Sequence, residues 1–180
     1  MKPIARLGLM AASTLALVAG TVGVAHAMGT GNPYLDEQVG VSYTVYQPSF
    51  TAGLKINTAD KSVSCPAGTE ANLTVAYGTH SKRQFTVSEA GTWCRDIGVG
   101  ATVLTTTIQG AQATVVAYCD PSTDTKPTKA DVKKCGGHLS MTLPGKAPYK
   151  QTNIRIETFG KKNLSADDLV KIAISRLAAG

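Results

Sequence analysis

The sequence has few charged residues (17%) and few aromatic residues (6%), whereas 43% of its 180 residues are hydrophobic. Chains that stay mainly disordered combine low hydrophobicity with high net charge, so this composition excludes that class. The chain is too short for a complete α/β barrel or a two-half dinucleotide-binding enzyme. It also has no collagen-like or heptad period. We therefore expect at most one compact domain.

Motifs that mark common catalytic centres are missing as well. The sequence has no Gly-x-Ser-x-Gly nucleophile elbow, no glycine-rich phosphate loop and no paired-histidine zinc motif. His80 lies in a polar loop and could serve as a catalytic base, but an isolated loop histidine is more often a solvated surface residue. We expect no enzymatic activity and no cofactor; a small hydrolase that uses His80 is the enzymatic alternative.

The one long hydrophobic run lies at the N-terminus. Lys2 and Arg6 precede a charge-free segment over residues 7–25, and the Ala-His-Ala sequence at 25–27 is typical of a signal peptidase site. This arrangement predicts a signal peptide over residues 1–27 and a secreted or cell-envelope protein. An uncleaved membrane anchor is the alternative, because the run approaches the roughly 20 residues that cross a bilayer. We expect no further transmembrane span after this segment.

All four cysteines, Cys65, Cys94, Cys119 and Cys135, follow the predicted signal peptide. An even number of cysteines in an exported chain indicates two disulfides. We favour Cys65–Cys94 with Cys119–Cys135, because each bond closes a local loop. The runner-up is Cys65–Cys119 with Cys94–Cys135. A metal site is the alternative, but only Cys135 and His138 form a close ligand pair and zinc would need two more ligands, so we expect no metal.

Short runs of alternating hydrophobic and polar residues fill the middle of the chain. Alternation of this kind is typical of strands with one face in a core and the other in solvent. Two β-branched runs are joined across residues 109–112, which favours a hairpin. We expect an antiparallel sheet, open or sandwich-like, whose strands come from residues 41–46, 54–56, 73–77, 85–87, 102–108, 113–119, 139–143 and 153–158, with a further short strand starting at Val63.

The hydrophobic period changes near the C-terminus. Ser165 followed by Asp168 matches a capping box, and a broad apolar stripe runs from Leu169 to Leu177. These features predict an amphipathic helix over residues 165–178 that packs on one face of the sheet. The expected fold class is therefore α+β.

These segments give a simple domain layout. The predicted signal peptide is followed by residues 28–39, which are polar and contain Gly and Pro, and we expect a flexible N-terminal arm there. Residues 40–180 then form a single disulfide-stapled, β-rich domain with the C-terminal helix.

The positive charge is concentrated in one part of the chain. Lys and Arg number 18 and Asp and Glu 12, a net charge of +6 that becomes +4 without Lys2 and Arg6. Residues 120–162 hold nine basic and four acidic residues. We predict a partner with anionic groups, either a cell-envelope polymer or lipid headgroups, and no nucleic acid, because aromatic residues are not interleaved with the lysines. The candidate anion-binding residues are Lys126, Lys129, Lys133, Lys134, Lys146, Lys150, Lys161 and Lys162.

The whole layout resembles small exported domains of actinobacteria. The resemblance rests on the N-terminal hydrophobic segment, the four later cysteines, the Thr- and Val-rich strands and the closing helix from Ser165 to Leu177. It implies a secreted or cell-envelope location and a binding or accessory role. We predict a non-enzymatic binding module. The alternatives are a carrier of a small apolar ligand between sheet and helix, and a secreted protease inhibitor.

Overall fold

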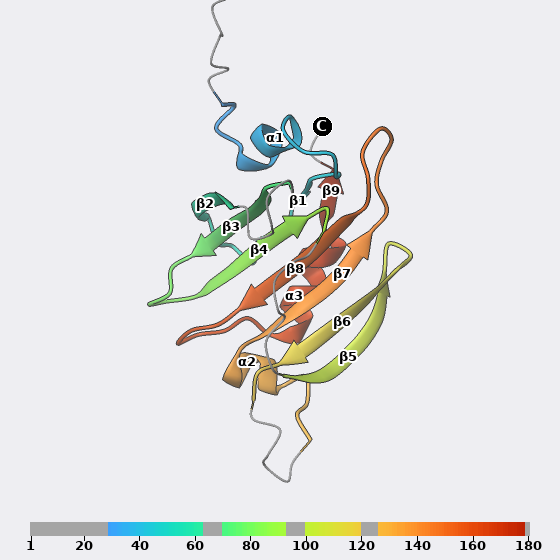
Figure 1. Ribbon diagram of the computed structural model, residues 1–180. Coiled ribbons are helices and arrows are strands. Elements are labelled where there is room, and N and C mark those ends of the chain that lie inside the picture. Colours follow the sequence, from blue (N-terminus) through green and yellow to red (C-terminus); the bar gives the residue numbers. More distant parts are fainter. Residues whose placement is uncertain (1–28, 63–69, 93–99, 120–125, 179–180) are drawn as a thin grey trace, which may run out of the picture.

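The computed structural model describes residues 29–62, 70–92, 100–119 and 126–178 (Figure 1). The predicted signal peptide, the strand from Val63 and the cysteines Cys65 and Cys94 lie outside these residues. Among the described helices, none is long and apolar enough to cross a membrane. In chain order the elements are α1 (Pro33–Gln38), β1 (Tyr46–Pro48), β2 (Ile56–Ser62), β3 (Asn72–Gly78), β4 (Gln84–Ala90), β5 (Ala101–Ile108), β6 (Ala111–Ala117), α2 (Asp131–Cys135), β7 (Gly137–Leu143), β8 (Thr152–Thr158), α3 (Ala166–Ile174) and β9 (Arg176–Ala178).

The main sheet is antiparallel and has seven strands in the order β2-β3-β4-β8-β7-β6-β5. Strands β1 and β9 form a separate two-stranded sheet. Figure 1 shows β8 inserted between β4 and β7, so the C-terminal hairpin closes the gap between the two earlier hairpins. The predicted α+β class and antiparallel sheet are confirmed; a sandwich-like arrangement is not.

Alternation along the strands separates the two faces of the main sheet. One row of directly paired residues is apolar and fully buried, and α3 packs over this face against β7 and β8. The helix adds Leu169, Ile172 and Ala173 to the same core. The space between helix and sheet is therefore filled by side chains. The buried row consists of Val75, Val87, Ile156, Leu139 and Val115.

The next row along the strands has the opposite character. It lies on the other face of the sheet, because successive residues of a strand point to opposite sides. Its residues are hydroxylic except for one arginine: Thr74, Ser88, Arg155, Ser140 and Thr114. The polar positions of the alternating runs thus form the polar face that the sequence predicts, although these four hydroxylic residues are only half-exposed and Arg155 is buried.

The C-terminal helix is shorter than its sequence pattern predicts. α3 ends at Ile174, and Arg176–Ala178 form β9, which pairs with β1. The prediction of a helix to residue 178 is therefore wrong in its last turn. The apolar stripe alone cannot reveal the stop, because Arg176 leaves the helix to reach a buried carboxylate, Glu89.

The predicted flexible arm contains a docked helix. Asn32 caps α1 by accepting a hydrogen bond from the Tyr34 backbone N–H at 3.0 Å. The Tyr34 side chain is fully buried, and its hydroxyl lies 2.8 Å from that of Tyr77 in β3. The interpretation of residues 28–39 as a flexible arm is therefore wrong for α1. One buried aromatic side chain in a polar segment is enough to anchor it.

Of the alternating run at 41–46, only Tyr46 belongs to a strand, β1. Of the run at 54–56, only Ile56 belongs to a strand, β2. Tyr43 and Val45 are fully buried, but their segment uses other backbone partners. Thr44 N–H donates to the Lys150 carbonyl at 3.1 Å, and Val45 N–H donates to the side chain of Gln38 at 2.7 Å. Burial of alternate residues therefore does not require a sheet ladder.

The predicted hairpin between β5 and β6 is confirmed, with a tighter turn than expected. Ile108 pairs directly with Ala111, which leaves the two-residue loop Gln109-Gly110. Both residues have positive φ, 52° and 81°. Such a turn matches the twist of the flanking strands, and glycine adopts positive φ without strain.

Cys119 and Cys135 form a disulfide with a Cα–Cα distance of 5.2 Å. This is the favoured pairing for these two cysteines, and it excludes the runner-up for them. The bond ties the end of β6 to α2, a short helix that the sequence analysis did not predict. Cys135 is thus not available as a metal-binding thiolate.

Candidate functional site

The eight candidate lysines do not form one continuous surface. Lys146 and Lys150 lie in the connection from β7 to β8, whereas Lys161 and Lys162 follow the other end of β8. β8 has seven residues, so the two groups are separated by about 23 Å of strand. Figure 1 shows these two connections at opposite ends of the sheet.

Three of the eight lysines gather at the α2 end of the sheet. Lys133, Lys161 and Lys162 line a cavity of about 450 Å³ together with Arg83. We call this feature the basic cleft; its lining also includes Asn163, Ser165 and Asp168. The cations come from three separate parts of the chain: the turn between β3 and β4, helix α2, and the connection from β8 to α3.

Arg83 was missed by the sequence analysis because it lies far from the lysine-rich stretch in the chain. Strand β4 pairs with β8, and this pairing brings the β3–β4 turn to the end of β8 where Lys161 and Lys162 follow. The only local signal is the basic pair Lys82-Arg83 in a turn. Its partners become apparent only from the strand order.

The basic cleft contains one carboxylate, which is already engaged. Asp168 Oδ2 lies 2.9 Å from Arg83 Nη2 and accepts a hydrogen bond of 2.9 Å from the Ser165 hydroxyl. Burial acts to raise the pKa of Asp168, but the Ser165 hydrogen bonds and the charges of Arg83 and Lys171 outweigh it, so the pKa is lowered. The ionised carboxylate offsets one of the four cations and leaves a positive excess.

The other candidate lysines on this side lie outside the cleft. Lys126, Lys129 and Lys134 are exposed on α2 or just before it. Lys129 pairs with Asp167 of α3 at 2.8 Å. An exposed pair of this kind contributes little stability, so these lysines are solvated side chains around the cleft.

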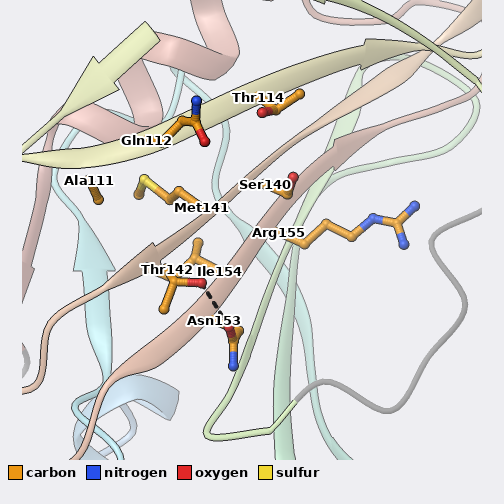
Figure 2. A pocket seen from close by; sticks show the side chains of 9 residues that line it. All are labelled: Ala111, Gln112, Thr114, Ser140, Met141, Thr142, Asn153, Ile154 and Arg155. Atoms are coloured by element: carbon orange, nitrogen blue, oxygen red, sulfur yellow. Dashed lines mark hydrogen bonds between the residues drawn. The ribbon is translucent and has the colours of Figure 1, made fainter. Parts of the chain in front are cut away.

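A second cavity, also about 450 Å³, lies over β6, β7 and β8 and is lined mainly from the polar sheet face (Figure 2). Thr142 donates to Asn153 Oδ1 at 2.8 Å, and the Asn153 amide donates to the Gly91 carbonyl at 2.9 Å. Figure 2 shows the guanidinium of Arg155 pointing away from the other labelled side chains. Much of the polar lining is therefore directed to internal partners.

Arg155 instead joins a polar cluster with Tyr118, His138 and Glu157. The Tyr118 hydroxyl donates to Glu157 Oε1 at 2.5 Å and accepts from Arg155 Nη2 at 2.6 Å. Because this hydroxyl has a single proton, His138 Nδ1, at 3.0 Å from the hydroxyl oxygen, must be the donor of their hydrogen bond. Burial, assisted by the Arg155 charge, lowers the pKa of His138 to about 4, so the imidazole is neutral at physiological pH.

His80, the candidate catalytic base, lies in the exposed turn after β3. Its ring contacts that of Phe159, with the centroids 5.8 Å apart. Among the described residues, no hydroxyl or thiol nucleophile is hydrogen-bonded to it. The geometry gives no support to a catalytic role.

Comparison with known proteins identifies a family for this chain, but that family has no described function. The family model described as "Caenorhabditis protein of unknown function, DUF282" matches residues 22–121, more than half of the chain. The chain belongs to the DUF282 family. The DUF282 match includes Arg83, whereas Lys133, Lys161 and Lys162 follow it. No curated protein and no solved structure matches the chain. The DUF282 description names no function.

Proposed function

We propose that this protein is a secreted or cell-envelope, non-enzymatic module that binds phosphate or carboxylate groups of an envelope polymer or lipid surface through the basic cleft. One observation carries the proposal: four cations from three parts of the chain line one cavity that contains a single, already paired carboxylate. The fold gathers like charges here, which costs electrostatic energy unless an anion is bound.

The lysines of the cleft are free to make such contacts. Among the described carboxylates, none forms an ion pair with Lys133, Lys161 or Lys162. A lysine ammonium has three donors on a flexible stem, which suits phosphate and carboxylate groups of varied geometry. Because the lysines are exposed, their attraction to an anion is screened by salt.

Two variants with equal loss of charge test the proposal. The cleft variant combines Lys133→Gln, Lys161→Gln and Lys162→Gln, and the control combines Lys126→Gln, Lys146→Gln and Lys150→Gln. Titration calorimetry with polygalacturonate and co-sedimentation with vesicles of phosphatidylcholine and anionic phosphatidylglycerol separate polymer binding from lipid binding. Each titration is repeated at low and high salt.

We expect the wild type and the control variant to bind at least one probe, with affinity that falls steeply as salt increases. The cleft variant should lose at least about tenfold in affinity, or 1.4 kcal/mol. Equal losses in both variants would show that only total charge matters and would refute the cleft. Absence of binding to both probes, or binding insensitive to salt, would also contradict the proposal.

A further inference from the structure

The two edges of the main sheet differ in how they are protected. Edge strand β2 contains Asp60 and Lys61, and charged residues discourage other strands from pairing. Edge strand β5, with the sequence ATVLTTTI, has no charged residue and no proline. In Figure 1 no described segment lies along the outer side of β5. A strand of this composition, open on one side, is prone to pair with another strand.

The backbone groups on the outer side of β5 follow from the hairpin turn. In a two-residue hairpin, the residues that flank the loop, here Ile108 and Ala111, exchange backbone hydrogen bonds. Since bonding alternates along the strand, Thr106 also bonds to β6, whereas the N–H and C=O groups of Thr105 and Thr107 point outward. Both of these threonine side chains are exposed.

We propose that β5 pairs antiparallel with β5 of a second copy of this chain, about a two-fold axis at Thr106. Thr105 of one copy then lies opposite Thr107 of the other, and each such pair exchanges two backbone hydrogen bonds. The side chains that meet in the three central pairs are all threonines, and threonine pairs are favourable across antiparallel strands. The main sheets of the two copies become one continuous sheet.

The charge distribution favours a second copy as the occupant of this edge. An antiparallel pair of identical strands is self-complementary, as a two-fold dimer requires. The basic cleft lies at the end of the sheet where β8 ends and β7 begins. Thr105 and Thr107 lie closer to the opposite end of the sheet, where the β5–β6 hairpin turns. The antiparallel arrangement therefore places the two clefts away from the axis and from one another.

Two double variants test the edge directly. Thr105→Lys with Thr107→Lys puts like charges opposite each other twice across the proposed seam. The matched control is Thr114→Lys with Gln112→Lys, which adds the same charges at the directly paired positions of β6 on the same face. Thr105→Pro is a second edge variant, because it removes one outward N–H and no hydrogen bond to β6.

Sedimentation velocity over a wide concentration range, without any anionic ligand, measures the association. We expect wild type and control to dimerise and both edge variants to raise the dimer dissociation constant at least about tenfold. Circular dichroism spectra identical to wild type would confirm that the variants fold. Wild-type protein that stays monomeric at its highest soluble concentration would overturn the proposal. Dimers unaffected by the edge variants would show that another surface associates, which also overturns it.

Discussion

Arg176 of β9 and Glu89 of β4 form an ion pair in the interior, and both side chains are fully buried. The same two residues hold β1: Arg176 donates to the Tyr46 carbonyl, and Glu89 Oε2 accepts from the Tyr46 N–H at 2.9 Å. Burial lowers the pKa of Arg176 to about 10, so it stays charged at neutral pH. The pair thus joins the two-stranded sheet to the main sheet.

Removal of one partner should be much more costly than removal of both. Glu89→Leu or Arg176→Met leaves a buried charge without its counter-ion, and we expect the free energy of unfolding to fall by about 3–5 kcal/mol. The double variant Glu89→Leu/Arg176→Met should be more stable than the sum of the single losses predicts. Urea unfolding of all four proteins measures this coupling; additive losses would contradict it.

His138 should make stability depend on pH. Its pKa is about 4 in the folded protein, below the ordinary value of 6.5. Between these values the unfolded chain binds the proton more tightly, so stability is fully present above about pH 6.5 and is lost as the pH falls toward 4. The loss should be on the order of 1–3 kcal/mol.

The His138→Gln variant should lack this part of the pH dependence in urea unfolding, whereas His80→Gln, at an exposed position, should retain it. An NMR titration of the histidine ring protons gives the folded pKa directly. A His138 resonance that titrates near 6.5 would show that the imidazole is solvated and would contradict the cluster geometry.

The Cys119–Cys135 disulfide should contribute to stability by restricting the unfolded chain. The cysteines are 16 residues apart, and closure of a loop of this size contributes about 3 kcal/mol in the chain-entropy model. Cys119→Ser/Cys135→Ser should therefore lower the free energy of unfolding by about that amount under non-reducing conditions. In reductant, wild type and variant should have the same free energy of unfolding. A difference that persists there would show that the serines disturb packing.

The capping box at the start of α3 offers a smaller and more local test. Ser165 Oγ accepts from the Asp168 N–H at 3.1 Å, and Asp168 Oδ2 accepts from the Ser165 N–H at 3.2 Å. Ser165→Ala should cost about 1 kcal/mol, whereas Ser165→Thr keeps the capping hydroxyl and should cost much less. Equal losses in the two variants, measured by thermal unfolding, would show that the hydroxyl does not cap the helix.

Local patterns in the sequence determine the solvated and buried faces, the main strands and the start of the helix. Alternation predicts the buried position of Leu139 and the polar position of Ser140, because successive strand residues point to opposite faces. The Ser165–Asp168 spacing predicts the helix start, since capping involves only adjacent residues. The Cys119–Cys135 pairing is likewise favoured because the loop it closes is local.

Only the tertiary structure decides which distant residues meet. The β4–β8 pairing brings Arg83 to Lys161 and Lys162, whereas the length of β8 separates Lys146 and Lys150 from them. Helix α3 ends at Ile174, and Arg176 beyond it pairs with the buried carboxylate of Glu89 in β4. Strand order and buried charge partners depend on contacts between segments far apart in the chain, and no local period records them.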